Sequence, residues 1–424
     1  MSQPSRLHLF QAFGIELEYM LVDKDTLAVK SITDELLKHE LGVYGSDFEN
    51  GIVTWSNELV MHVIELKSSK PEINFNALEN AFADNVAKIN SILEKWNAML
   101  MPTAAHPLMN PNTETKLWPH DNNEVYAIYD RIFNSKGHGW SNLQSTHLNL
   151  PFYDDEEFAK LHAAVRIVLP LLPALCASSP ILDGRVTGKL DTRLEYYKTN
   201  QSKIPSITGR VIPEGVFSKR NYLNTIYEKI KTDIAPHDPA GILDPVWVNS
   251  RGAIPRFDRG SIEIRVMDIQ ECPSADMAVI TLVIDLLQAL VSEKFFTMES
   301  QVKIKTDTLV SIFDQCLITG RSTVIENVEY LNVFGIEKSI TVGELWKSIF
   351  ARLVLFTPSL KKWEQPQLET IFNQGSLSER ILQALSNDLS DANIRKVYRQ
   401  LSGCLAQNKM FILCHPSMRS ENSR

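Results

Sequence analysis

Cysteine is scarce in this chain, and the few cysteines present are scattered. Five occur in 424 residues, at Cys176, Cys272, Cys316, Cys404 and Cys414, and no CxxC pair is found among them. An odd number of isolated cysteines argues against a disulfide framework and against a structural zinc site. We therefore expect reduced thiols and a cytoplasmic protein.

Basic blocks and long apolar runs are missing as well. The net charge is −8, and no Lys/Arg block exceeds a pair or two, so nucleic acid and an anionic membrane are not expected partners. The N-terminus, MSQPSRLHLFQAF, lacks the apolar core of a signal peptide. The most apolar stretches, 167–182 and 277–291, are too short to span a bilayer and predict buried helices.

The stretch RGAIPRFDRGSIEIRVMD, residues 251–268, has the strongest chemical signal. Its second half alternates between two faces, which are Ile262, Ile264 and Val266 on one side and Glu263, Arg265 and Met267 on the other. Arg256 and Arg259 lie just upstream. A carboxylate that can hold Mg²⁺, beside arginines that can hold phosphate oxygens, is equipment for phosphoryl transfer. A solvated strand with an ordinary charge pair is the alternative.

Two further segments place glutamates on predicted strands. In residues 13–22, FGIELEYMLV, Glu16 and Glu18 share one face and repel unless a cation lies between them. Residues 51–67 carry Glu58 and Glu65, whose spacing of seven would point them to opposite faces of one unbroken strand. If both serve one site, a bulge or an irregular turn must separate them.

A histidine and a cationic loop complete the candidate set. His147 lies in the alternating stretch NLQSTHLNLPF, residues 142–152, together with Ser145 and Asn149 on its face. Residues 178–193 form a Gly- and Pro-marked loop whose cations, Arg185, Lys189 and Arg193, can close over phosphates. A structural histidine and a solvated loop are the alternatives.

Helical periodicity covers much of the remaining chain. It predicts helices over 31–41, 74–100, 121–135, 155–178, 217–234 and 274–292. From about residue 300 it dominates, over 307–318, 341–356, 377–387 and 390–405. No Gly/Ser-rich linker and no internal repeat divides the chain. We therefore expect a catalytic domain over residues 1–300 and a helical C-terminal extension over 301–424 packed on the same body.

Taken in order, GIELE, the glutamates seven apart, QSTHLNL, LLPALCASSPILDGRVTGK and GAIPRFDRGSIEIRVMD resemble glutamate–cysteine ligase type 2, a carboxylate–amine ligase family of the glutamine synthetase superfamily. The resemblance spans roughly residues 10–295, and its last two segments are the specific ones. It implies an α+β fold with a curved antiparallel sheet of glutamine-synthetase type and helices on the outer face. It also implies ATP and two or three Mg²⁺ ions as cofactors.

By matching positions, the resemblance also implies roles for individual residues. The metal ligands would be Glu16, Glu18, Glu58, Glu65, His147 and Glu263. Arg265 would stabilise the transferring phosphoryl group, with Glu263 beside it as a catalytic residue. The candidates for binding phosphate or substrate carboxylate are Arg256, Arg259, Arg185, Arg193 and Lys189. The family often has Asp where this chain has Val186, which leaves the substrate open.

The implied reaction is ATP-dependent amide formation, in which an amine such as cysteine attacks a γ-glutamyl phosphate. Its substrates are small molecules, glutamate or a similar carboxylate and the amine, and a homo-oligomer is compatible with the sequence. Two alternatives stay open. One is a phosphagen-kinase-like phosphotransferase, whose group has a related sheet. The other is a catalytically silent nucleotide-binding protein, which retention of all six ligand positions disfavours.

Overall fold

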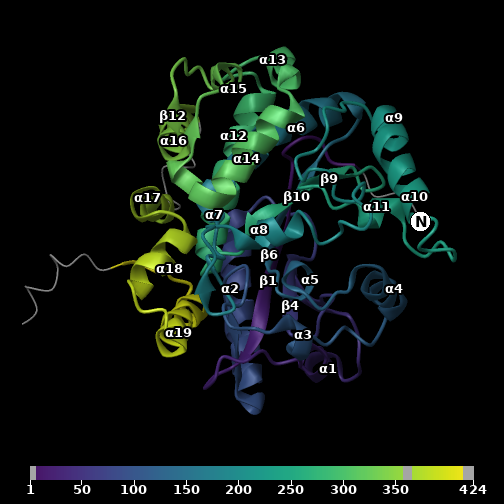
Figure 1. Cartoon of the computed structure of the whole chain (residues 1–424), viewed down its shortest axis with the longest axis vertical. Helices are drawn as coiled ribbons and strands as arrows, with labels where there is room; N and C mark the ends of the chain where they lie inside the picture. Colours follow the sequence, from purple (N-terminus) through teal and green to yellow (C-terminus); the bar gives the residue numbers. More distant parts are fainter. Residues whose placement is uncertain (1–5, 357–364, 414–424) are drawn as a thin grey trace, which may run out of the picture.

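The computed structural model describes residues 6–356 and 365–413, and an antiparallel sheet forms its centre (Figure 1). Its strands are β1 (Gly14–Asp23), β2 (Asp47–Asn50), β3 (Val53–Asn57), β4 (Val63–Ser68), β5 (Ala98–Met101), β6 (Ser145–Pro151), β9 (Ala253–Arg256) and β10 (Ser261–Asp268). The order is β2-β3-β4-β1-β6-β10-β9, and β5 also pairs with β1. The α+β class with an antiparallel sheet is confirmed. Its curvature stays a prediction.

Strand β1 alternates as its sequence predicts. Ile15, Leu17 and Tyr19 are fully buried in the core, so Glu16 and Glu18 face the other side of the sheet. An antiparallel sheet commonly packs one face on the core and leaves the other open. The polar face of β1 is therefore free to build a site.

Strand β10 departs from strict alternation. Its register with β6 shifts between Ile264 and Met267, so two residues of β10 oppose one residue of β6 there. Such a β-bulge inserts one extra residue and re-aims the side chains beside it. Met267 consequently turns into the core, where it is 1% exposed. The prediction that Met267 shares the open face with Glu263 and Arg265 is wrong for this reason.

The glutamates seven residues apart lie on a hairpin. Strand β3 ends at Asn57 and β4 begins at Val63, and the two pair antiparallel with Ser56 opposite Glu65. Glu58 therefore lies at the start of the connecting turn. The sequence required a bulge or an irregular turn between Glu58 and Glu65 if both serve one site. The structure has a turn there, which connects two antiparallel strands.

Long helices cover the apolar face of the sheet. The central ones are α2 (Phe75–Leu93), α6 (Asp155–Val168) and α12 (Pro273–Val291), and α12 contacts both others. Helix α6 ends well short of the predicted residue 178, because the prolines at 170 and 173 cannot continue it. Helix α12 is long and apolar enough to cross a membrane by length and composition, yet 89% of its most apolar window is buried inside the protein. The buried helix predicted over residues 274–292 is confirmed. The expectation that its apolar stretch is too short to span a bilayer is wrong by length and composition.

The shorter elements connect these layers. The helices are α1 (Thr33–Leu41), α3 (Pro111–Glu114), α4 (Asn123–Phe133), α5 (His138–Ser141), α7 (Pro173–Cys176), α8 (Thr192–Tyr197), α9 (Lys219–Tyr222), α10 (Glu228–Ile234), α11 (Pro245–Val248), α13 (Met298–Lys303) and α15 (Val328–Asn332). Two small hairpins pair β7 (Ile181–Leu182) with β8 (Arg185–Val186) and β11 (Val324–Ile325) with β12 (Ile340–Thr341). Tighter turns span Glu94–Trp96, Leu169–Leu171 and Gly320–Ser322, and a π-helical turn spans Leu223–Tyr227.

The C-terminal part is helical. Its main helices are α14 (Thr306–Thr319), α16 (Val342–Phe356), α17 (Gln365–Gln374), α18 (Leu377–Leu385) and α19 (Asp391–Gln407). All of these except α17, which was not predicted, lie close to the predicted ranges. Helix α19 lies against β5 and α2 (Figure 1). A second apolar core joins Met20 and Val22 of β1 to Ile381 and Leu401 of these helices. The boundary at residue 300 stays a prediction, and Cys414 lies outside the described residues.

Candidate active site

One face of the sheet carries the glutamates and the histidine. Residues that pair directly across antiparallel strands lie side by side on the same face. The direct pairs are Glu16 with His147, Glu263 with Asn149, and Glu18 with Glu65. Glu16 and Glu18 are two residues apart on β1, and His147 and Asn149 are two residues apart on β6. The side chains of all three pairs therefore share one face of the sheet.

Hydrogen bonds draw these side chains together around His147. Its Nδ1 lies 2.8 Å from a carboxylate oxygen of Glu16, and its Nε2 lies 2.9 Å from the hydroxyl of Ser145. The backbone N–H and the hydroxyl of Ser145 donate to Glu18 at 2.6 and 3.0 Å. Glu16, Glu65 and His147 each bring one ligand atom within 4.8 Å of the other two.

The glutamates Glu16, Glu18, Glu58, Glu65 and Glu263, called here the carboxylate cluster, include members whose pKa values shift in opposite directions. Burial, and next the charge of Glu16, raise the pKa of Glu65 to about 8. Burial and the charges of Glu18 and Glu65 raise the pKa of Glu58 well above its usual range. Burial opposes ionisation of Glu16 too, but the hydrogen bond and charge of His147 bring its pKa down to about 2. Buried oxygen ligands with uncompensated charge fit a hard divalent cation such as Mg²⁺.

Arginines border the cluster on the side of β9 and β10. Nη2 of Arg265 lies 3.0 Å from one oxygen of Glu263, and Nε of Arg256 donates to the other at 3.3 Å. Burial disfavours the charge on Glu263, but the charge of Arg265 lowers the pKa of this carboxyl. Nε of Arg265 is buried and has no hydrogen-bond partner among the described residues. Arg265 therefore keeps a donor available for a ligand.

Arg193 reaches the site from α8. Its side chain is 2% exposed and forms an ion pair with Asp268, and its Nη1 donates to the backbone carbonyl of Arg265 at 3.4 Å. Its Nη2 is buried without a partner in the part of the chain that the structure describes. An unused guanidinium donor suits a ligand carboxylate, which accepts charge-assisted hydrogen bonds.

Two cavities flank the carboxylate cluster. The first, called here the aromatic cavity, measures about 280 Å³ and contains Glu18, Glu58, His147, Arg193 and Arg265 in its wall. Five rings also form part of its wall, namely Tyr126, Tyr129, Trp140, Tyr197 and Trp247. A wall of rings with a few convergent polar groups is typical of a small-molecule site.

The second, called the cationic cavity, measures about 510 Å³ and contains Glu16 and Asn149 in its wall. Its cations are Arg6, Lys67, Lys70 and Arg259. Lys67 also forms an ion pair with Glu65 at 3.1 Å. The carboxylate cluster thus lies between a cavity rich in rings and a cavity rich in cations, which suits joining two ligands of different chemistry.

Comparison with known proteins agrees with this geometry. The model of glutamate–cysteine ligase family 2 matches residues 12–308, which is most of the chain. The chain belongs to glutamate–cysteine ligase family 2. Membership places it among ATP-dependent ligases that form amide bonds.

Individual relatives extend the comparison. An uncharacterized protein of Archaeoglobus fulgidus is 31% identical over 94% of this chain and 100% of its own length. A protein of Bradyrhizobium sp. (strain ORS 278), named as a candidate glutamate–cysteine ligase 2, is 26% identical over 63% of this chain and 59% of its own length. This chain therefore matches less than two thirds of that ligase relative.

Two solved structures share the fold. Glutamate–cysteine ligase of Francisella tularensis, in complex with AMP, superposes with a TM-score of 0.60 at 13% identity, covering 92% of this chain and 88% of that one. A bifunctional glutathione synthetase of Pasteurella multocida superposes with a TM-score of 0.61 at 12% identity, covering 94% and 53%.

Some residues predicted to bind phosphate or substrate carboxylate do not lie at the carboxylate cluster. Arg185 is exposed on β8, and Lys189 forms an ion pair with Glu195 at 2.9 Å. Neither is part of the wall of the two cavities. Arg259 is exposed beside Asp258, at 3.8 Å, in the cationic cavity. Of the cationic loop, the structure therefore brings only Arg193 to the carboxylates.

Some residues of the site are not visible as candidates in the sequence. Lys67 is two positions after Glu65 on the same strand face, so alternation would have found it. The rings of the aromatic cavity come from α4, α5, α8 and α11, far apart along the chain. Aromatic residues at helical spacing usually belong to a core, so no local pattern marks them.

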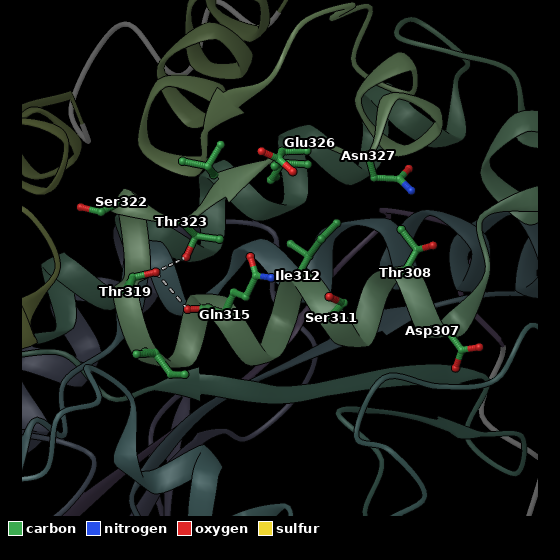
Figure 2. Close-up of a pocket in the computed structure, with 13 residues that line it drawn as sticks. Asp307, Thr308, Ser311, Ile312, Gln315, Thr319, Ser322, Thr323, Glu326 and Asn327 are labelled. Atoms are coloured by element: carbon green, nitrogen blue, oxygen red, sulfur yellow. Dashed lines mark hydrogen bonds between the residues drawn. The ribbon is translucent and has the colours of Figure 1, made fainter.

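A larger groove lies mostly beyond the segment that the family model matches. It measures about 800 Å³ and runs between α14 and β11. Figure 2 shows Thr319 of α14 beside Thr323 at one end of the groove, and Thr308 of α14 near Asn327 at the other. The charged side chains in its wall are Asp307 and Glu326, both acidic. Without a cation in its described wall, this groove does not suit a nucleotide polyphosphate.

Proposed function

We propose that this protein activates glutamate with ATP and joins the resulting γ-glutamyl phosphate to an amine. The observation that carries the proposal is the position of the carboxylate cluster, between a cationic cavity and a cavity with a free guanidinium donor. ATP brings about four negative charges, and a carboxylate brings another, so the two cannot approach without cations between them.

The ligands for these cations are present in the chain. Glu16, Glu18, Glu58, Glu65, His147 and Glu263 would hold two or three Mg²⁺ ions. Bound Mg²⁺ neutralises the phosphate oxygens and the attacking carboxylate during phosphoryl transfer. The raised pKa values of Glu58 and Glu65 support this assignment, since burial and neighbouring glutamates disfavour their charged forms, which a bound cation would stabilise.

The two cavities divide the substrates by charge. The cationic cavity suits the nucleotide, because Arg6, Lys67, Lys70 and Arg259 offer ammonium and guanidinium groups to phosphate oxygens. The aromatic cavity suits glutamate, whose α-carboxylate would meet the free Nη2 of Arg193. Arg265 borders the cluster and would take up charge on the γ-phosphoryl group as it transfers.

The chemistry proceeds in two balanced steps. An oxygen of the γ-carboxylate attacks the γ-phosphorus, the bond to the bridging oxygen breaks, and ADP leaves. The amine nitrogen then attacks the acyl carbon, the carbon–oxygen bond to phosphate breaks, and phosphate leaves while the amine loses one proton. The side chains of this site orient the carboxylate and exclude water, which would otherwise hydrolyse the acyl phosphate.

A product assay tests this proposal. Purified protein with Mg²⁺, ATP, glutamate and hydroxylamine is expected to release ADP and form γ-glutamyl hydroxamate, with both signals dependent on glutamate. Glu263→Gln should remove both signals while the protein stays folded, and Glu228→Gln, an exposed glutamate on α10, serves as the matched control. ATP loss with a phosphoramidate product would instead indicate a phosphagen-kinase-like enzyme, and binding without turnover a silent protein.

A further inference from the structure

The aromatic cavity has more apolar wall than glutamate requires. Besides its five rings it contains the aliphatic side chains of Leu59, Val60, Val63 and Leu143. Apolar and aromatic walls favour a ligand with an apolar body, because burial of that body removes it from water. The two carboxylates of glutamate would contact the polar groups of the cavity and would leave this apolar wall uncovered.

Contacts within the protein hold several of these rings in place. Trp140 donates its indole N–H to the backbone carbonyl of Asn200 at 3.1 Å. Its ring centroid lies 5.3 Å from that of Tyr129, a separation typical of favourable aromatic pairs. Asn57 donates to the hydroxyl of Tyr126 at 3.3 Å. The apolar wall is therefore formed before a ligand binds.

The supply of cations limits what else can enter. The described wall of this cavity contains two arginines, Arg193 and Arg265, and no lysine. Arg265 is paired with Glu263, and the proposed function assigns its free Nε to the γ-phosphoryl group. Arg193 is paired with Asp268 and keeps one free nitrogen. Glutamate brings two carboxylates, one that reacts at the cluster and one for Arg193. A third carboxylate, on the amine, would find no further arginine or lysine in the described wall of this cavity.

We propose that the acceptor is a primary amine with an aromatic or alkyl body and no carboxylate of its own. The inference rests on the proposed function, because it names the second substrate of the same site. The acceptor nitrogen would reach the acyl carbon beside the cluster, and its body would lie against Trp140, Tyr129 and Tyr126. Amino acids such as cysteine would then be poor acceptors.

Matched pairs of amines test the inference. Cysteamine differs from cysteine, and 2-phenylethylamine from phenylalanine, by the carboxylate alone. In assays with Mg²⁺, ATP and glutamate, the amine without the carboxylate should show a kcat/KM at least about tenfold higher in each pair, the scale of one unpaired charged group. Equal values, or higher values for cysteine and phenylalanine, would overturn the inference.

Hydroxylamine separates this inference from the proposed function, since so small an acceptor needs no apolar wall. Hydroxamate formation together with a preference for cysteine would overturn the inference and leave the activation of glutamate intact. No hydroxamate at all would overturn both. As a second readout, Trp140→Leu should raise KM for 2-phenylethylamine more than KM for methylamine. An equal change for the two amines would count against a ring-binding wall.

Discussion

At the level of single residues, Arg265 carries a charge that lysine cannot reproduce. Its guanidinium is planar and fork-shaped, and one nitrogen already pairs with Glu263 while another stays free. A planar fork follows the charge of a transferring phosphoryl group, whereas an ammonium is a point charge. Arg265→Lys is expected to lower kcat by roughly 10²–10³-fold, the scale for one lost stabilising donor, and to change KM for ATP much less.

Steady-state kinetics with ATP varied at saturating glutamate separate these two parameters. A variant with raised KM and unchanged kcat would show that Arg265 contributes to nucleotide binding alone. A large loss of unfolding free energy in Arg265→Lys would point to a structural role for the ion pair with Glu263.

At the level of elements, helix α12 holds a buried carboxyl with one unpaired oxygen. Asp285 is 6% exposed, and its Oδ2 lacks a hydrogen-bond partner among the described residues. Burial raises its pKa from 3.8 to about 7. As the pH rises, Asp285 therefore ionises in the unfolded chain before it ionises in the folded protein. The free energy of unfolding falls between about pH 4 and pH 7 as a result.

Asp285→Asn should remove this pH dependence. Between pH 4.5 and 8, the unfolding free energy of the variant should rise relative to that of the starting protein by about 2–3 kcal/mol. Urea unfolding at a series of pH values measures the difference, and Asp84→Asn, on an exposed position of α2, controls for loss of a carboxylate. A pH-independent difference would show that Asp285 is ionised in the folded protein.

Elements also show how far sequence alone reaches. Alternation places Glu16, His147 and Glu263 on strand faces, and pairing of those strands then brings them together without further information. Alternation fails at Met267, because a bulge is a property of two paired strands and not of one. It also cannot distinguish Arg193 from Arg185, since both belong to one cationic loop and only tertiary packing turns one of them inward.

The aromatic cavity lies further beyond sequence-based reasoning. Its rings come from four short helices, and each ring alone is compatible with an ordinary core residue. Only the assembled fold shows that Tyr129 and Trp140 border the same space as Glu58. A pattern within one element predicts that element, whereas a cavity depends on how several elements meet.

At the level of the whole molecule, a buried ion pair ties the C-terminal helices to the end of the catalytic sheet. Arg380 of α18 and Glu271, just after β10, are both fully buried and form two hydrogen bonds. Glu271 also accepts the backbone N–H of Phe411 at 3.1 Å. The Archaeoglobus relative matches 402 residues, so it extends past residue 308 into these helices.

Removing the ion pair between Glu271 and Arg380 should lower the free energy of unfolding of the whole protein. Glu271→Gln leaves the Arg380 charge buried without a counter-charge, which is expected to cost about 3–5 kcal/mol of unfolding free energy. The double variant Glu271→Met/Arg380→Met should recover much of that loss, because no buried charge remains. Chemical denaturation checks both values. A loss below about 1 kcal/mol for Glu271→Gln, the scale of a surface pair, would show that the two parts are not coupled here.

The most direct test of the acyl-phosphate mechanism follows one oxygen atom. Glutamate labelled with ¹⁸O in its γ-carboxylate is incubated with the protein, Mg²⁺, ATP and an accepted amine, and the phosphate released is examined by mass spectrometry. If the carboxylate attacks the γ-phosphorus, each turnover yields ADP and carries one ¹⁸O into inorganic phosphate. AMP with pyrophosphate, or phosphate without the label, would contradict the mechanism.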